Sequence, residues 1–282
     1  MGTEAAVYKA QSAKARPLLQ ERLTPPMRSE LIVSMSFRDK RVIITGAGRG
    51  LGAAFAVVLA DQGADVIMTG RNVENMASLA ESIRLRCGRR PETLHIDLSD
   101  ISQVTLAAKK MRDEGRPLDI LVNNGAQWLP GGMHDHDAFA INSTITGIVT
   151  GTLLFTRGLI PLLEKSGAGD ILNIISISGI ANTPLLGASV AYYAAKHGQA
   201  GMNDGLRQEM KGRPVRVSAI YPSYIKDISP LDEAAWNAVY EAGSLATNRD
   251  IVEAALFAVS RPRHVTLASI VIDPDQGGMF PG

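Results

Sequence analysis

The chain has 282 residues, which is enough for one large α/β domain or two small ones with a substantial core. A net charge of +1 and 20% charged residues imply no general attraction to nucleic acid or to an anionic membrane. The single cysteine, Cys87, excludes a disulfide within the chain and is typical of a reducing compartment, so we expect a cytoplasmic protein.

The first 38 residues differ from the rest of the chain. They carry scattered charges but no sustained apolar run, which is unlike a secretory signal, and their glutamates oppose the composition of a transit peptide. We therefore expect a flexible N-terminal extension over 1–38 and a single domain over 39–282. We also expect a chain that begins at Met35 to fold and to stay active.

From Arg41 onward, short apolar runs alternate with segments of helical periodicity. Apolar strands separated by helices predict a parallel sheet that is covered on both faces, with right-handed crossovers. The predicted fold is α/β: a Rossmann-like doubly wound parallel sheet with helices on both faces. Strands are expected at 42–44, 64–68, 93–96, 120–122, 171–177, 215–220 and 268–272. Helices are expected at 53–60, 73–87, 102–112, 137–163, 191–210 and 250–259.

Within the longest predicted helix, the run from Ala138 to Thr156 carries no charge and is long enough to raise the question of a membrane span. Polar residues and glycines interrupt this run, and it lies between two predicted strands. We therefore expect a buried helix of a layered fold and no membrane partner.

A glycine-rich turn, TGAGRGLG over residues 45–52, joins the first predicted strand to the first predicted helix. Glycines permit a tight turn there and let backbone N–H groups approach a pyrophosphate at the helix N-terminus. The spacing Gly46-x-x-x-Gly50-x-Gly52 differs from the G-x-G-x-x-G fingerprint, and no lysine of a P-loop follows. The alternative, a merely flexible loop, is disfavoured by the position between strand and helix.

Tyr192 and Lys196 stand four residues apart, so both side chains project from one face of a helix. A neighbouring ammonium favours phenolate, which predicts a tyrosine pKa below its usual value of about 10 and a group able to exchange protons. The alternative is an aromatic ring packed against an aliphatic stem. Tyr193 is a second candidate phenol at a different spacing from Lys196.

The glycine turn, Asn123 to Ala126, Asn142, Ser176 and the Tyr192–Lys196 pair occur in the order of the short-chain dehydrogenase/reductase family. The chain resembles this family over nearly its whole length outside the extension. The resemblance implies an NAD(P)-dependent oxidoreductase that transfers a hydride between nicotinamide and a carbonyl or secondary alcohol. The expected catalytic residues are Asn142, Ser176, Tyr192 and Lys196. The expected cofactor-binding residues are Gly46, Arg49, Gly50, Leu51, Gly52, Arg71, Asp97, Leu98, Asn124, Gly125, Tyr192, Lys196 and Pro222.

Each catalytic residue has a role implied by the resemblance. Tyr192 exchanges the proton, and Ser176 binds the substrate carbonyl oxygen. Lys196 lowers the pKa of Tyr192 and binds the nicotinamide ribose, while Asn142 holds a water beside Lys196 and completes a proton relay. Ser178 competes with Ser176, because the two point to one face of an ideal strand, and a structural asparagine is the alternative for Asn142.

Two residues depart from the family pattern on the far side of the expected site. Ser223 follows Pro222 where the family usually has glycine. Asp227 stands where a threonine usually contacts the nicotinamide amide, which adds negative charge near the pyrophosphate. Asp97 matches the family's adenine-contacting aspartate, although such a residue also serves as a turn or helix cap.

The choice of cofactor is predicted from the end of the second strand. An NAD-binding domain needs an acidic residue there for the ribose 2′-hydroxyl, whereas this chain has Thr69-Gly70-Arg71-Asn72. Arg71 and Arg49 together suit a 2′-phosphate, so we expect a preference for NADP(H), with NAD(H) as the alternative. Two ordinary surface arginines are the alternative explanation.

An apolar substrate pocket is suggested by residues that follow the fourth and sixth strands. Trp128, Leu129 and Pro130 add apolar surface, and a helical stripe is expected within 224–245, although core packing explains a stripe equally well. The stripe comprises Leu231, Ala235, Trp236, Val239 and Tyr240. His134 and His136 form a lone His-x-His on a loop, so no metal is expected.

Rival functions on this fold are a dinucleotide-binding sensor without catalysis, an NAD-dependent alcohol dehydrogenase, and a dehydratase or epimerase. A sensor needs none of the serine, tyrosine and lysine residues, and the last class usually brings a larger substrate domain. The charge-free helix matches one that the family uses in subunit pairing, so a homodimer or homotetramer is expected.

Overall fold

The computed structural model describes residues 36–275, so the predicted extension lies almost wholly outside the described residues. The described part is built on a sheet of seven parallel strands in the order β3-β2-β1-β4-β5-β6-β9. The strands are β1 (Arg41–Thr45), β2 (Asp65–Gly70), β3 (Glu92–His95), β4 (Ile120–Asn123), β5 (Gly169–Ile174), β6 (Val215–Pro222) and β9 (Ser269–Ile272).

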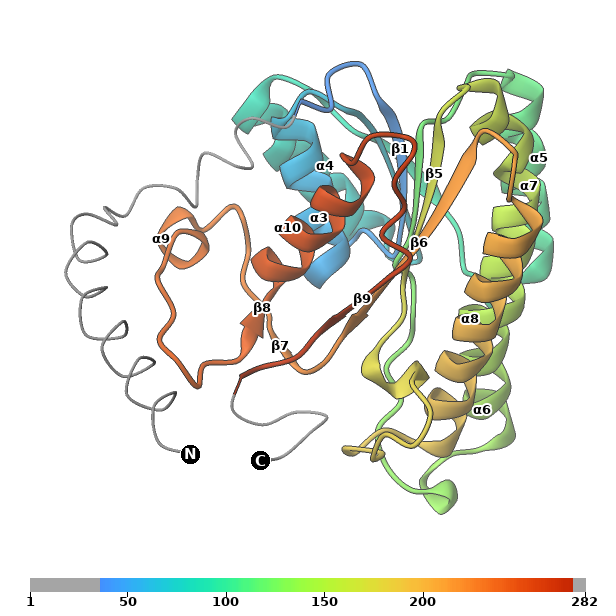
Figure 1. Cartoon of the computed structure of the whole chain (residues 1–282), viewed down its shortest axis with the longest axis vertical. Helices are drawn as coiled ribbons and strands as arrows, with labels where there is room; N and C mark the ends of the chain where they lie inside the picture. The colour runs from blue at the N-terminus through green and yellow to red at the C-terminus, as the bar shows by residue number, and fades with distance from the viewer. Residues whose placement is uncertain (1–35, 276–282) are drawn as a thin grey trace, which may run out of the picture. The chain divides into compact units, whose positions relative to one another are not determined.

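Helices cover both faces of this sheet, which confirms the predicted doubly wound fold (Figure 1). One face carries α3 (Gly50–Asp61), α4 (Val73–Cys87) and α10 (Asn248–Val259). The other carries α5 (Ile101–Glu114), α7 (Thr152–Lys165) and α8 (Val190–Glu209). The strand order reverses direction between β1 and β4, and a ligand crevice is expected outside the carboxyl ends of the strands at this point.

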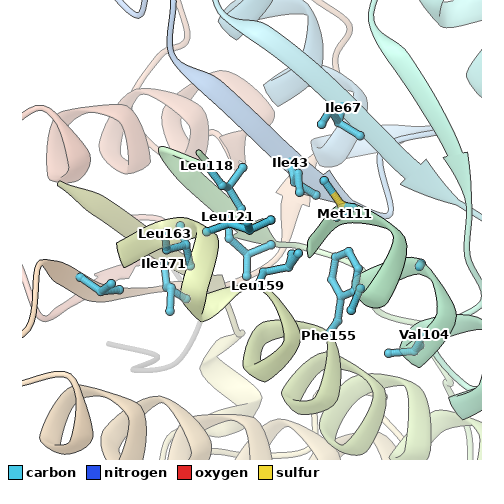
Figure 2. Close-up of a cluster of buried hydrophobic side chains, with 14 of the residues drawn as sticks. Ile43, Ile67, Val104, Met111, Leu118, Leu121, Phe155, Leu159, Leu163 and Ile171 are labelled. Atoms are coloured by element: carbon cyan, nitrogen blue, oxygen red, sulfur yellow. The ribbon is translucent and has the colours of Figure 1, made fainter. Parts of the chain in front are cut away.

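The core between the sheet and the α5–α7 layer is formed by aliphatic side chains and one phenylalanine (Figure 2). Ile43, Leu121 and Ile171 rise from three adjacent strands, and Phe155 and Leu159 of α7 pack onto them, all fully buried. Burial of each such side chain contributes about 1.5–3 kcal/mol. This continuous core holds the carboxyl ends of the strands in fixed positions.

The predicted long helix is present but has three parts. They are α6 (Ala138–Ile145), a π-helical segment η2 (Thr146–Gly151) and α7. A Cβ on Gly151 would lie 1.8 Å from the Leu98 carbonyl oxygen, so glycine is required where η2 meets the segment after β3. Among residues 36–275, Ala138–Lys165 is the helix with the length and hydropathy of a membrane span, yet its Phe155 and Leu159 belong to the core.

Two local predictions were wrong. The fifth strand ends at Ile174, so Ser176 lies in the turn that leads into the 3₁₀-helix η3 (Ile177–Gly179). The segment 224–245 forms no long helix stripe: it holds α9 (Glu233–Trp236), and Val239 is 87% exposed. A helix of a single turn is costly to nucleate, and a side chain left in water gives it no packing energy.

The segment around α9 is joined to the body by a small pair of strands. β7 (Ile225–Lys226) pairs in parallel with β8 (Ala246–Thr247), directly before α10. In the chain, α9 lies between β6 and α10, and so it follows the carboxyl end of β6.

Candidate active site

A cavity of about 420 Å³ lies at the crevice where the strand order reverses. Its wall combines the glycine turn, the end of β2, the segments after β3 and β4, and the α6–η2 helix. The expected cofactor residues in this wall are Gly46, Arg49, Leu51, Gly52, Arg71, Asp97, Leu98, Asn124 and Gly125. The tertiary structure therefore brings together residues from four separate turns of the chain.

The glycine turn is shaped by close backbone contacts. A Cβ on Gly52 would lie 2.2 Å from the Gly46 carbonyl oxygen, and a Cβ on Gly46 would lie 2.7 Å from Gly125 Cα. Gly46 and Gly50 both have positive φ, at 66° and 57°, which favours glycine. The first turn of α3 thus presents backbone N–H groups without side chains in front of them, which suits a dinucleotide pyrophosphate.

Thr45 and Asn124 lock the glycine turn to the turn after β4. The Thr45 hydroxyl accepts hydrogen bonds from the Asn124 and Gly125 N–H groups at 3.0 and 2.8 Å. The Asn124 amide donates back to the Thr45 carbonyl at 3.1 Å. The two turns therefore form one rigid edge of the cavity.

Arg71 follows β2 and lines this cavity. Its guanidinium donates to the Gln127 side chain at 3.2 Å and lies 3.9 Å from the Asp97 carboxylate, with 54% of the side chain exposed. Asp97 also accepts hydrogen bonds from the backbone and hydroxyl of Ser99 at 2.8 and 2.7 Å. Arg71 is thus held in the cavity wall by weak, exchangeable contacts.

Ser176, Tyr192 and Lys196 meet beyond the carboxyl end of β5. The Ser189 hydroxyl caps α8 by accepting from the Tyr192 N–H, which starts the helix just before the two catalytic candidates. The Tyr192 hydroxyl is hydrogen-bonded to Ser176, and the Lys196 ammonium lies 5.7 Å from the centre of the Tyr192 ring.

Glycine at position 179 allows the close approach between η3 and α8. A Cβ there would lie 2.8 Å from the Lys196 carbonyl oxygen. The neighbouring Ser178 does not compete for the site, because it is buried and its N–H donates to the Ser176 hydroxyl at 3.1 Å. Tyr193, the second candidate phenol, instead donates to the Thr183 carbonyl at 2.8 Å.

A glycine-lined nucleotide cavity beside a serine–tyrosine–lysine cluster points to one family, and sequence comparison decides it. The family model described as short chain dehydrogenase matches residues 40–238. The chain belongs to the short-chain dehydrogenase family. This short-chain dehydrogenase is an oxidoreductase that acts on CH–OH and C=O groups.

Relatives of known sequence and structure resemble nearly the whole described domain. An uncharacterized oxidoreductase of Staphylococcus saprophyticus is 31% identical over 241 residues, which are 85% of this chain and 99% of that protein. A metagenomic short-chain oxidoreductase in complex with NADP is 26% identical with a TM-score of 0.70, covering 86% and 100% of the two chains. A short chain dehydrogenase from Escherichia coli complexed with NADPH is 27% identical with a TM-score of 0.70, covering 83% and 96%.

Burial dominates the protonation equilibria of this short-chain dehydrogenase site. Burial raises the pKa of Tyr192 to about 12, and the hydrogen bond with Ser176 offsets only part of that shift. Burial also lowers the pKa of Lys196 to about 7. The expectation that Lys196 depresses the pKa of Tyr192 is therefore wrong for this structure, because desolvation disfavours both charged forms. Tyr192 is a neutral phenol near pH 7 and thus a proton donor.

Gln199 is a site residue that the sequence reasoning missed. The Lys196 ammonium donates to the Gln199 side-chain oxygen at 2.9 Å and to the Ile174 carbonyl at 3.2 Å, and both side chains are buried. The signal in the sequence is a polar stripe at helical spacing, in which Lys196, Gln199 and Asn203 occupy the buried face of α8.

Asn142 is not brought to this cluster. Its side chain is exposed on α6, whereas the neighbouring Ser143 and Thr144 line the cavity. Ile148, in the π-helical segment, is 1% exposed and belongs to the same buried cluster as Tyr192, with Ala140, Ile141 and Val149 packed against it. Asn142 precedes this segment and lies six residues before Ile148, so the two side chains project from different faces of the helix. A relay through a water on Asn142 is therefore not supported by the geometry.

The two departures from the family pattern, Ser223 and Asp227, do not line the main cavity, and neither does Pro222, which ends β6 and is buried. The Ser223 N–H donates to the Ile272 carbonyl at 3.0 Å, and Asp227 lines a second pocket with Arg49 and Gly50. A Cβ on Gly50 would lie 3.6 Å from an Asp227 carboxylate oxygen, so this carboxylate faces the first turn of α3. Asn248 donates a hydrogen bond to the same carboxylate, which holds it in place.

No group of three or more metal-ligating side chains occurs within the described residues. His134 and His136 lie in and beside the short 3₁₀-helix η1 (Met133–Asp135), and Asp135 is occupied in capping that turn through the Gly132 N–H at 2.6 Å.

Proposed function

We propose that this short-chain dehydrogenase is an NADP(H)-dependent oxidoreductase for neutral, apolar carbonyl compounds or the corresponding secondary alcohols. The observation that carries the proposal is the buried Tyr192 phenol, which is hydrogen-bonded to Ser176 and lies beside Lys196 beyond the carboxyl end of β5. A reduced nicotinamide, when bound, would supply a hydride, and a hydride together with one proton converts C=O into CH–OH.

The side chains of this cluster divide the proton chemistry among them. The Ser176 hydroxyl donates a hydrogen bond to the carbonyl oxygen, and so favours the charge that develops there during reduction. The neutral Tyr192 phenol gives its proton to the same oxygen, and takes it back when an alcohol is oxidised. The buried Lys196 stabilises the phenolate that Tyr192 becomes after the transfer.

Gln199 takes the structural place beside Lys196 that the sequence assigned to Asn142. Its side-chain oxygen accepts a hydrogen bond from the Lys196 ammonium at 2.9 Å. Holding the ammonium between Gln199 and the Ile174 carbonyl favours the protonated form of Lys196 against the cost of burial. We therefore assign Gln199 as a positioning residue for Lys196.

The preference for NADP(H) rests on charge around the adenosine end of the cavity. Arg71 and Arg49 both line it, and the segment after β2 carries no carboxylate. Arg71 is already turned toward the cavity residues Gln127 and Asp97, from which a 2′-phosphate has only weak contacts to displace. An NAD-dependent alcohol dehydrogenase remains the alternative, and the coenzyme comparison below separates the two.

Assembly as a homodimer or homotetramer is part of the proposal. The outer side of the α6–α7 helix exposes apolar side chains, including Phe139 at 78% and Leu153 at 40%. Large apolar side chains exposed along one helix are suited to association, and closed symmetric pairing is the common solution.

The decisive experiment monitors NADPH oxidation in the presence of ketones, aldehydes and quinones, with wild type and Tyr192→Phe compared on the best substrate. Loss of turnover in the variant, with NADPH binding retained by fluorescence titration, is the expected result. A variant that keeps the wild-type kcat contradicts the assignment of Tyr192. A wild-type protein that binds NADPH but turns over no member of the panel favours the sensor.

A further inference from the structure

One aromatic side chain packs against Tyr192, and a second aromatic side chain packs against the first. The Trp128 ring lies edge-on to the Tyr192 ring, with centroids 4.7 Å apart and an interplanar angle of 78°. Tyr224 approaches Trp128 in the same manner, at 6.4 Å and 79°. We call Trp128 and Tyr224 the aromatic clamp.

The aromatic clamp is accessible, although the residue it adjoins is not. Trp128 is 44% exposed and Tyr224 is 58% exposed, whereas Tyr192 is 8% exposed. Rings of this size normally gain from burial, so apolar ring surface left open beside a reactive group marks a place where a ligand can cover it. The clamp residues follow β4 and β6, at the carboxyl end of the sheet where ligands of this fold bind.

The position of Trp128 is fixed relative to Tyr192 by main-chain contacts. The Ser189 N–H, at the start of α8, donates to the Leu129 carbonyl at 2.9 Å. An antiparallel bridge also joins Pro130 to Ala188. The segment that carries Trp128 is therefore hydrogen-bonded to the start of the helix that carries Tyr192, which fixes the indole edge-on to the phenol.

The local charge distribution favours a neutral ligand. Lys226, the basic residue nearest to Tyr224 in the chain, lies over the Tyr240 ring, 5.2 Å from its centre. Trp128 is followed by Leu129 and Pro130, and Tyr224 is followed by Ile225. These neighbours offer apolar contact and no fixed charge for an acidic or phosphorylated substrate.

We propose that the aromatic clamp selects ketones that carry a flat aromatic ring one carbon away from the reacting carbonyl, over saturated ketones of the same carbon skeleton. The inference rests on the proposed function and names the substrate class of that site. A flat ring makes stacked or edge-to-face contacts with Trp128 and Tyr224, which a puckered saturated ring does not. Each such pairing changes affinity by about twofold to tenfold.

The test uses 2-tetralone and 2-decalone, which share one bicyclic skeleton and differ in the aromaticity of one ring. The carbonyl is not conjugated in either compound, so their intrinsic reactivity toward hydride is similar. With NADPH, the wild type is expected to show a kcat/KM for 2-tetralone about fourfold to a hundredfold above that for 2-decalone. Equal values for the two ketones overturn the proposal.

Clamp variants connect that preference to the named rings. Trp128→Leu and Tyr224→Leu are each expected to lower the 2-tetralone/2-decalone ratio by about twofold to tenfold. Phe257→Leu is the matched control, because Phe257 is an aromatic ring at the surface of α10 beneath Arg261, and it is expected to leave the ratio unchanged. Clamp variants that keep the wild-type ratio contradict the assignment.

A binding measurement separates failure of the clamp from failure of the proposed function. The chain has two tryptophans, so Trp236→Phe leaves Trp128 as the sole indole fluorophore. NADP⁺ cannot reduce a ketone, so binding can be measured without reaction when NADP⁺ is present. 2-Tetralone is expected to quench Trp128 emission. 2-Decalone is expected to bind about tenfold more weakly than 2-tetralone when it is used to displace it. Quenching without turnover of either ketone under NADPH supports the clamp and refutes the proposed reaction. Absence of quenching overturns the clamp even if other ketones are reduced.

Discussion

Replacing Gln199 by leucine tests whether the environment of Lys196 sets the working pH of the enzyme. Leucine keeps most of the volume but removes the oxygen that accepts from the ammonium at 2.9 Å, leaving the Ile174 carbonyl at 3.2 Å. A hydrogen bond to a charged group contributes about 1.5–3 kcal/mol. Since about 1.4 kcal/mol corresponds to one pKa unit, the pKa of Lys196 should fall by roughly 1–2 units.

The direction of the effect follows from the charge that Lys196 must carry. The ammonium stabilises the Tyr192 phenolate, so activity that depends on it declines as pH rises through the pKa of Lys196, which is about 7 in the structure. In Gln199→Leu that decline should begin roughly 1–2 pH units lower. Gln199→Glu places a carboxylate beside the ammonium and should move the decline to higher pH.

The assay is the pH dependence of kcat/KM for NADPH-dependent reduction of one ketone, measured for wild type and both variants. Gln208→Leu is the control, because it makes the same exchange at an exposed position of α8. A cooperative thermal transition in each variant verifies folding. Superimposable pH profiles for wild type, Gln199→Leu and Gln199→Glu would refute the reasoning.

Four further outcomes are expected. Tyr192→Phe should lower kcat, measured from NADPH oxidation, by roughly 10²–10⁴-fold. The Kd for NADPH, measured by fluorescence titration, should change little. Arg71→Ile combined with Gly70→Asp should lower the ratio of kcat/KM for NADPH to that for NADH by about tenfold to a hundredfold. The control Arg38→Ile, at an exposed position, should leave this ratio unchanged. The Cβ added at Gly70 lies 3.3 Å from Met76 and needs only a small shift of that side chain. Without ligand, the free energy of unfolding, measured by urea titration, should rise between about pH 7 and pH 9. Lys196 has a pKa of about 7 in the folded state and 10.5 in the unfolded state, so in this range the unfolded state binds a proton that the folded state releases. Lys196→Met should remove the rise. Light scattering should give a mass well above the 30.1 kDa of one chain, and Phe139→Glu with Leu153→Glu should return it toward that value.

The sequence alone determined the features that depend on local pattern. Apolar runs that alternate with helical periodicity lead to a doubly wound parallel sheet, because each strand must be covered on both faces. The glycine turn was recognisable because Gly46 and Gly52 leave backbone where a Cβ would collide. The spacing of Tyr192 and Lys196 placed them on one helix face before any tertiary contact was known. Their catalytic roles stay predictions.

Only the tertiary structure decided which polar groups surround Tyr192 and Lys196, because that depends on how separate segments meet. The long helix turns Ile148 into the buried cluster that contains Tyr192 and leaves Asn142 exposed. Gln199 becomes the partner of Lys196, since α8 buries that face against the end of β5. Burial also reverses the expected direction of the Tyr192 pKa shift, because desolvation outweighs a lysine that is itself driven toward neutrality.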